Sequence, residues 1–291
     1  MPSIILVAGM HRSGTSALTR AINLAGVPLP SNLMPPSTTE NADGFWESVD
    51  LMRIHDAMLQ SLRSGWNDPR EIPGDWFSGS AGADARRALT GWIEAEMRGK
   101  DTLLVKDPRV CRLLPLWQIV CGAMGIETYT VIPFRNPIEV ARSLKARDGF
   151  AEMNSFFLWL RHVLDAERFS RGRARSFCSF DQLMNDGLGT VRRIASELRL
   201  TFPTPDAELG ALLSEALKPG LRHHAVPHDE VTEACERIPP LLVTYRWLLD
   251  AAEGKTPPFE TLDEVTYRMR MSEQTRGIAI AVPGASPPPT A

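Results

Sequence analysis

The chain has 291 residues, 43% of them hydrophobic, and a formal net charge of −3 at pH 7. It is long enough to bury one large core, and its charge implies no general affinity for polyanions such as nucleic acids. No apolar run approaches the roughly 20 residues of a membrane-spanning helix, and the first expected strand begins near Ser3, which leaves no room for a signal peptide. We therefore expect a soluble, cytoplasmic protein without stable membrane insertion.

Two kinds of apolar pattern alternate along the chain. Short continuous apolar runs predict buried strands, and apolar residues that recur every three to four positions predict helices. The expected strands cover about residues 3–9, 102–106, 127–134 and 176–180. The expected helices cover about residues 14–26, 48–62, 83–98, 112–124, 152–170, 181–198, 206–216 and 229–252, and one more begins at Pro137 after the cap residue Asn136.

Strands that alternate with helices favour a parallel sheet with helices on both of its faces. We therefore expect an α/β fold, a three-layer sandwich around a central parallel sheet. Residues 1–271 are expected to form a single domain, and residues 272–291, rich in Pro, Ala and Gly, a disordered tail. Ligands of such sheets bind at the carboxyl ends of the strands. Four side chains at or just after expected strand ends define one site: Arg12, Lys106, Arg135 and Phe180.

The stretch after the first strand has the composition of an anion-binding loop. Gly9 ends the strand and Gly14 opens the helix, so a tight loop directs backbone N–H groups and the positive end of a helix at one point. The side chains that add charge or hydroxyl donors are Arg12, Ser13, Thr15 and Ser16. The spacing nearly matches the phosphate-loop pattern G-x-x-x-x-G-K-[ST], but Thr15 stands at the lysine position and the charge has moved to Arg12. We interpret this stretch as a phosphate- or phosphosulfate-binding loop.

The loop HRSGTS resembles the 5′-phosphosulfate loop of sulfotransferases that use 3′-phosphoadenosine 5′-phosphosulfate (PAPS), which usually reads PKSGT or PRSGT. The segment FRNPIEVARSL resembles the 3′-phosphate motif of that family, an arginine after a strand and a serine eight residues later; the arginine offers a planar fork of donors. The segment around Phe180 resembles the one whose aromatic residue lines the adenine pocket. The resemblance implies the P-loop-like sulfotransferase fold and a PAPS site made of Arg12, Ser13, Gly14, Thr15, Ser16, Arg135, Ser143 and Phe180.

The segment VKDPR resembles the K-D-P segment of tyrosylprotein sulfotransferases and of many bacterial sulfotransferases. By that resemblance Lys106 donates to the oxygen that bridges sulfur and phosphorus, and Arg12 and Lys106 stabilise the charge on the transferring and leaving groups. Cytosolic sulfotransferases have a catalytic histidine two residues after this lysine, where this chain has Pro108. A carboxylate must then take the acceptor proton. The first candidate is Glu47, whose counterpart in tyrosylprotein sulfotransferases is the base, and the second is Asp107, which could instead hold the lysine in place.

Parts of the family pattern are missing. Ala17 replaces the usual tryptophan after the loop, and the Arg-Lys-Gly and Gly-Asp-Trp-Lys signature of cytosolic members is not found near the C-terminus, so some adenine and 3′-phosphate contacts stay unassigned. A histidine cluster lies outside the pattern as well. Its spacing fits no zinc site and favours a surface loop or the lining of the acceptor pocket. The cluster consists of His223, His224 and His228.

The sequence therefore predicts a sulfotransferase that moves the sulfuryl group of PAPS to a hydroxyl of a small-molecule, carbohydrate or glycolipid acceptor, with PAP as product and no metal. The alternative is a phosphate-loop kinase that uses ATP, in which Asp107 imitates the acid that holds magnesium; the missing loop lysine counts against it. The acceptor and the oligomeric state are not readable from the sequence. Three tryptophans could stack on an acceptor or pack within the loops that carry them: Trp46, Trp66 and Trp76.

Overall fold

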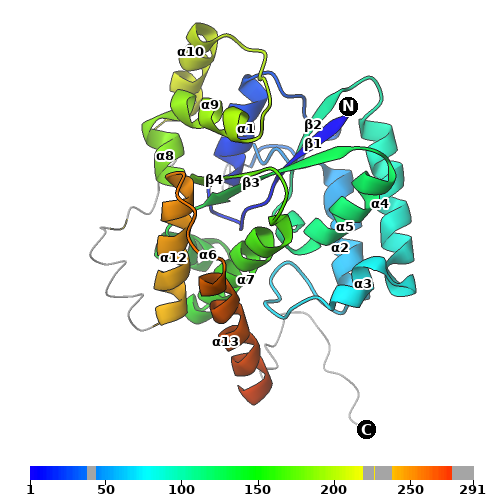
Figure 1. The fold of residues 1–291 in the computed structure, drawn as a ribbon, viewed down its shortest axis with the longest axis vertical. Coiled ribbons are helices and arrows are strands. Elements are labelled where there is room, and N and C mark those ends of the chain that lie inside the picture. Colours follow the sequence, from blue (N-terminus) through cyan, green and yellow to red (C-terminus); the bar gives the residue numbers. More distant parts are fainter. Residues whose placement is uncertain (38–43, 219–225, 227–237, 277–291) are drawn as a thin grey trace.

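The computed structural model describes residues 1–37, 44–218, 226 and 238–276 of the chain (Figure 1). The strands in these residues are β1 (Ser3–Val7), β2 (Thr102–Lys106), β3 (Glu127–Phe134) and β4 (Arg175–Ser179). The helices are α1 (Thr15–Leu24), α2 (Val49–Ser61), α3 (Gly74–Ser78), α4 (Ala83–Glu96), α5 (Val110–Ala123), α6 (Pro137–Asp148), α7 (Glu152–Ser170), α8 (Phe180–Asn185), α9 (Gly187–Glu197), α10 (Asp206–Ala216), α12 (Pro239–Ala252) and α13 (Glu260–Arg276).

The four strands form one parallel sheet in the order β2-β1-β3-β4. The pairing register of the strands at two places determines where the site residues lie. Val7, the last residue of β1, lies opposite Lys106, and Phe134, the last residue of β3, lies opposite Ser179 of β4. The loops that follow β1, β3 and β4 therefore leave the sheet at the same edge, next to Lys106.

Helices cover both faces of the sheet, and alternate residues of β1 feed two separate cores. Ile4 and Leu6 belong to the larger core, beneath helices α2, α4, α5, α6, α7, α12 and α13. Ile5 and Val7 belong to the smaller core, beneath α1, α8, α9 and α10. Figure 1 shows α1, α9 and α10 on one side of the strands and α5, α7 and α12 on the other. This arrangement confirms the expected three-layer α/β fold with a central parallel sheet.

Most element boundaries agree with the sequence prediction within two residues, but the expected helix over 181–198 is two helices. Asp186 has φ −144° and ψ 79°, which no helix accommodates, and its side chain accepts from the backbone N–H of Gly189 at 2.8 Å. It thereby ends α8 and caps α9. Phe180, expected at the end of a strand, is the first residue of α8.

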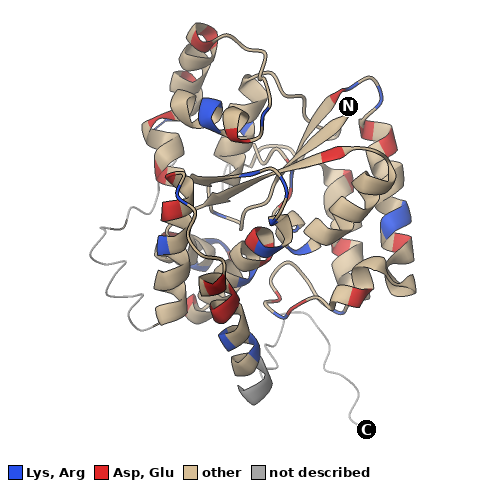
Figure 2. Cartoon of the chain, in the orientation of Figure 1, with Lys and Arg blue, Asp and Glu red and all other residues tan. Residues whose placement is uncertain are grey.

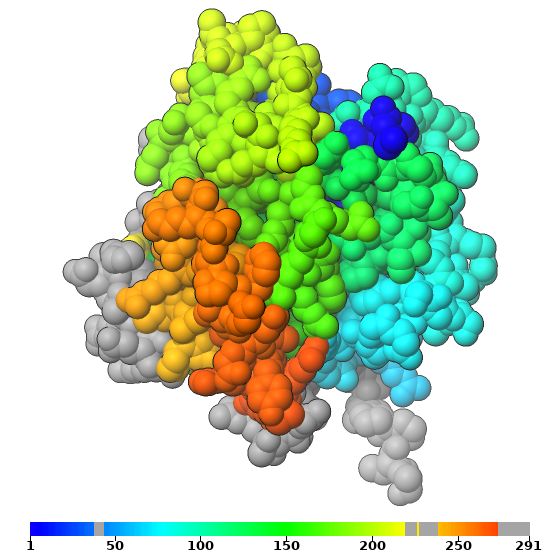
Figure 3. Space-filling view, in the orientation of Figure 1, coloured from blue at the N-terminus to red at the C-terminus, as the bar shows by residue number. Residues whose placement is uncertain are grey.

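Helix α13 was not expected from the sequence. Its buried residues Leu262, Val265 and Met269 join the larger core, and the expected boundary of the tail at residue 272 falls inside this helix. In Figure 3 the orange surface of the C-terminal helices is continuous with the green surface of the middle of the chain. The rest of the expected tail and the histidine cluster at 223–228 lie outside the described residues, so the division into domain and tail stays a prediction.

Charged side chains of both signs are spread over the outer helices (Figure 2). No helix in the described ranges is long and apolar enough to span a bilayer.

Candidate active site

The loop between β1 and α1 turns through two left-handed positions, Arg12 with φ 65° and Gly14 with φ 80°. Helix α1 begins at Thr15, and no described side chain caps its N-terminus. Its first backbone N–H groups can therefore bind an anion. A Cβ at Gly9 would lie 2.6 Å from Cγ of Pro133 and 2.8 Å from Cγ2 of Thr15, so only glycine allows the loop to start this close to β3.

Two residues of the expected PAPS site meet across the loop. Nε of Arg12 donates to Oγ of Ser143 on α6 at 2.7 Å. Next to Arg12, the hydroxyl of Ser13 is buried and has no hydrogen-bond partner among the described residues. Buried hydroxyls without partners are rare in folded proteins and often mark the place of a ligand or a water molecule. The loop thus holds an unused donor beside a fixed cation.

Arg135 and Phe180 form a second group at the ends of β3 and β4. The guanidinium carbon of Arg135 lies 4.6 Å from the ring centroid of Phe180, in cation–π geometry. Nε of Arg135 donates to Oε2 of Glu139 at 2.5 Å, which fixes the side chain, while its Nη2 is buried without a partner in the described part of the chain. A Cβ at Gly14 would lie 2.4 Å from Cδ2 of Phe180, so the Phe180 ring also contacts the anion-binding loop.

Lys106 ends β2 and is held by three oxygen atoms. Its Nζ pairs with Oε1 of Glu47 and donates to the carbonyl of Phe45 at 3.1 Å and to Oγ of Ser16 at 3.4 Å. Lys106 and Glu47 are both buried. Burial raises the pKa of Glu47, although the neighbouring Lys106 favours the carboxylate. The structure therefore brings the expected catalytic lysine into contact with the first candidate base.

A sharp turn before α2 brings Glu47 to this position. Trp46 has φ 59°, in the left-handed region, and the guanidinium of Arg20 on α1 lies 5.0 Å from the centroid of its ring. Ser48, the next residue, caps α2 by accepting from the backbone N–H of its first turn at 3.4 Å. Glu47 is thus fixed between a packed tryptophan and a helix cap.

Asp107, the second candidate base, has both carboxylate oxygens occupied. Oδ1 accepts from the backbone N–H and Nη1 of Arg109 at 2.9 and 3.0 Å, and Oδ2 accepts from Nδ1 of His55 at 2.9 Å. Nε2 of His55 in turn accepts from Trp117 at 3.1 Å, so Nδ1 carries the imidazole proton. Burial alone would raise the pKa of Asp107, but Arg109 and His55 hold it well below its usual value.

These contacts bear on the role of Asp107. None of its contacts within the described ranges reaches Lys106. Asp107 instead joins the end of β2 to α2 and α5, and Arg109 extends the connection to Asp56 with Nε 2.6 Å from Oδ1. His55 was not expected from the sequence as part of this site. It could have been found from its position four residues after Leu51 on the apolar face of α2, because a buried polar side chain needs a hydrogen-bond partner.

The sequence-derived site residues therefore lie along one edge of the sheet. In the spatial order β4, β3, β1, β2 they are Phe180, Arg135, the loop with Arg12, and Lys106 with Glu47. The arrangement runs from an aromatic ring with an arginine, through an anion-binding loop, to a buried Lys–Glu pair. His11 lies in the anion-binding loop directly before Arg12. Its Nε2 is buried and has no partner among the described residues.

Comparisons with known proteins give a structural match but no sequence match. No protein-family model matches the chain, and no curated protein does. Sulfotransferase STF9 from Mycobacterium avium is 14% identical, with a TM-score of 0.50 over 81% of this chain and 75% of that chain. A sulfotransferase from Alicyclobacillus acidocaldarius is 15% identical (TM-score 0.45, 88% and 97% covered), and sulfotransferase STF1 from Mycobacterium tuberculosis H37Rv is 16% identical (TM-score 0.41, 81% and 76% covered). The similarity to STF9 confirms the expected sulfotransferase fold.

Proposed function

We propose that the chain is a PAPS-dependent sulfotransferase that transfers a sulfuryl group to the hydroxyl of a small-molecule, carbohydrate or glycolipid acceptor in the cytoplasm. The observation that carries this proposal is the order of the site residues along the sheet edge. Phe180 and Arg135 suit the adenine and the 3′-phosphate, the loop around Arg12 suits the 5′-phosphosulfate, and Lys106 suits the leaving oxygen. The groups of PAPS follow one another in the same order.

The polar atoms that lack partners support the same site. Two of the buried side-chain atoms that have no partner among the described residues, Oγ of Ser13 and Nη2 of Arg135, belong to this site. An unpaired donor that is buried costs free energy unless a ligand or water satisfies it. Ser13 and Nη2 of Arg135 are therefore suited to phosphate oxygens, and the ring of Phe180 beside them suits stacking on a flat base.

PAPS supplies the sulfuryl group. A new S–O bond to the acceptor forms as the S–O bond to the phosphate breaks, and the electron pair of the broken bond goes to the phosphate oxygen. Arg12 and Lys106 stabilise negative charge on either side of this group. Lys106 is paired with Glu47, so Glu47 is released as a base when Lys106 turns to the bridging oxygen. The raised pKa of Glu47 makes it a stronger base than an ordinary carboxylate.

The alternative hypothesis, that the chain is a kinase, has less support. A kinase would need Asp107 to hold magnesium, but His55 and Arg109 occupy both of its oxygens. The position of the kinase lysine holds Thr15, which is buried next to Gly9. Asp107 is for the same reason the weaker of the two candidate bases, and a role in holding the end of β2 against α2 and α5 suits it better.

Calorimetry with PAP, ATP and ADP, each with and without magnesium, tests the proposal. We expect PAP to bind without magnesium, at least tenfold more tightly than ADP, because only PAP carries the 3′-phosphate that Arg135 can bind. A screen with radiolabelled PAPS and a library of hydroxyl compounds then measures transfer directly. ATP binding that is tighter than PAP binding and depends on magnesium would support the kinase instead.

A further inference from the structure

His11 is a loop residue that the PAPS site does not account for. It precedes Arg12, and its ring centroid lies 4.4 Å from that of Trp66, with an angle of 56° between the two planes. Its Nε2 is buried, and no described residue pairs with it. The nitrogen is a strong hydrogen-bonding atom in a place that water reaches poorly, and a ligand is suited to supply the partner that the described residues do not.

Trp66 holds the His11 ring in place from the connection between α2 and α3. The ring of Phe150 stacks against Trp66 with 5.6 Å between the two ring centroids. The guanidinium carbon of Arg147 lies 5.5 Å from the centroid of the Trp66 ring. Both residues come from the end of α6 and the turn after it. The faces of Trp66 are therefore covered by His11, Phe150 and Arg147, and its role is to position His11.

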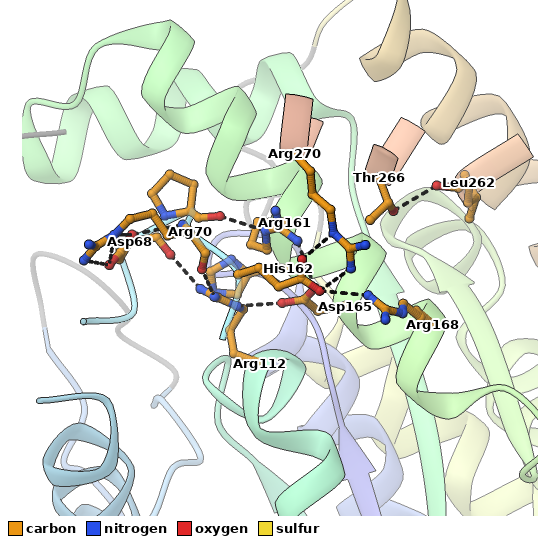
Figure 4. A network of polar contacts seen from close by, with 12 residues as sticks. Asp68, Arg70, Arg112, Arg161, His162, Asp165, Arg168, Leu262, Thr266 and Arg270 are labelled. Carbon is orange, nitrogen blue, oxygen red and sulfur yellow. Dashed lines mark hydrogen bonds and ion pairs between the residues drawn. The ribbon is translucent and has the colours of Figure 1, made fainter. Parts of the chain in front are cut away.

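The chain after Trp66 is fixed by buried arginines (Figure 4). Nη1 of Arg112 on α5 donates to the carbonyl of Asp68 at 2.6 Å, and Nε of Arg161 on α7 donates to the carbonyl of Pro69 at 2.7 Å. Asp165 pairs with both arginines, at 2.7 Å from Nε of Arg112 and 3.3 Å from Nη1 of Arg161. This network makes the connection that carries Trp66 part of the rigid body of the protein.

The environment of His11 keeps its imidazole neutral. Burial lowers the pKa of His11 well below its usual value, and the titratable groups that face it from β2 and its loop, α6 and α7 lower it further. They are, in order of effect, Arg147, Arg109, His162 and Lys106. A neutral imidazole nitrogen hydrogen-bonds to a hydroxyl in either tautomer, because a hydroxyl both donates and accepts.

The cations around His11 already have carboxylate partners. Nη2 of Arg147 lies 2.8 Å from Asp148, Arg109 pairs with Asp56 and Asp107, and Lys106 pairs with Glu47. These pairs neutralise the three cations, and the neighbouring Arg12 is assigned to PAPS in the proposed function. An uncharged group is therefore the better partner for the neutral imidazole of His11.

We propose that Nε2 of His11 binds a second hydroxyl of the acceptor, next to the hydroxyl that is sulfated. This inference rests on the proposed function, in which the proton of the reacting hydroxyl goes to Glu47 and so is not shared with His11. The acceptor is then an uncharged molecule with two neighbouring hydroxyls, as in catechols and sugars. Transfer forms the S–O bond to the first hydroxyl and leaves the second hydroxyl unchanged.

The test compares two uncharged probes that differ by one hydroxyl, catechol and phenol, in wild-type protein and in His11→Phe, with radiolabelled PAPS as the sulfuryl donor. The measured quantity is the ratio of kcat/KM for the catechol to kcat/KM for the phenol. Because His11→Phe keeps the ring against Trp66 and removes Nε2, we expect this ratio to fall about 10–100-fold. His11→Gln places an amide near the position of Nε2 and is expected to restore most of the ratio.

Two controls separate this inference from the proposed function. Affinity for PAP is expected to be the same in all three proteins, and Glu47→Gln is expected to lower turnover of both probes without changing their ratio. An unchanged ratio in His11→Phe, or a wild-type protein that sulfates compounds with a single hydroxyl but none with two neighbouring hydroxyls, overturns the inference alone. A loss of turnover with both probes in His11→Phe but not in Glu47→Gln would make His11 the base and also overturn it. Failure of the wild-type protein to bind PAP or to sulfate any acceptor overturns the proposed function.

Discussion

Nε of Arg12 donates to Oγ of Ser143 at 2.7 Å, across 131 residues of sequence. The family resemblance assigns these two residues to opposite ends of PAPS, the 5′-phosphosulfate and the 3′-phosphate. The hydrogen bond instead joins the anion-binding loop to α6. Ser143 therefore orients Arg12, and we propose that it also offers its own hydroxyl proton to the ligand.

The first prediction concerns this pair. Ser143→Ala removes the acceptor for Arg12 Nε and one donor, so we expect PAP affinity to fall by about 1.5–3 kcal/mol, the range for hydrogen bonds to charged groups. Calorimetric titration with PAP measures the loss. AMP, which lacks the 3′-phosphate, should also bind more weakly because the hydrogen bond that orients Arg12 is lost for both ligands. A loss confined to PAP would mean that Ser143 contacts the 3′-phosphate and has no effect on Arg12.

The second prediction concerns Arg135, whose Nη2 is buried without a partner in the described ranges. Arg135→Ala should weaken PAP by about 10–100-fold and leave AMP nearly unchanged, because only PAP carries the group that this guanidinium can bind through a charge-assisted hydrogen bond. Arg142→Ala, at an exposed position in the middle of α6, is the matched control and should change neither affinity. Equal weakening of PAP and AMP by Arg135→Ala would show that the arginine supports the fold or the adenine stack.

The third prediction separates contact from backbone strain at Gly14. This glycine has φ 80°, and a Cβ on it would lie 2.4 Å from the Phe180 ring, whereas Gly149 has φ 70° and nothing within 4 Å of such a Cβ. Gly149→Ala should therefore lower the free energy of unfolding by only about 1 kcal/mol, the cost of a left-handed alanine. Gly14→Ala should cost more and should also weaken PAP at least tenfold, because the ring must move. Urea titrations and calorimetry of both variants give the comparison; equal effects would exclude a role for the Gly14–Phe180 contact.

Much of the site follows from the sequence because its residues are local to strand ends. The carboxyl ends of parallel strands meet at one edge, so a residue just after a buried strand has a predictable place, as Arg135 and Phe180 show. Contacts that depend on tertiary packing were not predictable. The pairing of Lys106 with Glu47 spans 59 residues, and the bond of His55 to Asp107 spans 52. Contacts between residues this far apart produce no periodic pattern in the sequence from which they could be predicted.

Two other features of the chain show the same limit. The sequence suggested no helix after residue 252, because α13 is mostly polar and buries only a narrow stripe. Its anchors are long-range: Arg270 pairs with Glu71 at 2.5 Å, and Arg168 on α7 pairs with the same carboxylate at 2.9 Å. Asp186 divides one expected helix into two. An aspartate is compatible with the interior of a helix, and this one is a cap only because the backbone turns at its position.

The fourth prediction concerns the stability that Asp107 supplies. Because its pKa is lower in the folded chain than in the unfolded chain, its contribution is complete above the unfolded pKa of about 3.9 and is lost as pH falls through the folded pKa. Asp107→Asn should therefore lower the free energy of unfolding by about 1.5–3 kcal/mol at pH 7, and the difference from wild type should shrink below about pH 4. Denaturant titrations between pH 2.5 and 7 measure both curves. A difference for Asp107→Asn that stays constant with pH would contradict the lowered pKa.

The last prediction concerns the base. Glu47→Gln keeps the shape of the side chain and removes its basicity, so we expect PAP affinity to stay within about threefold and turnover to fall about 10²–10⁴-fold. The wild-type pH profile carries a second signature. Since burial raises the pKa of Glu47, its carboxylate is lost already at a pH above the ordinary value of 4.5, and kcat should fall with decreasing pH in that range. The residual turnover of Glu47→Gln should lack this acid limb. Steady-state kinetics at saturating acceptor, with the melting temperature as a check of folding, provide the data. If Glu47→Gln keeps near-normal turnover while Asp107→Asn binds PAP normally and is inactive, the base is Asp107, and the pairing of Glu47 with Lys106 serves only to hold the lysine.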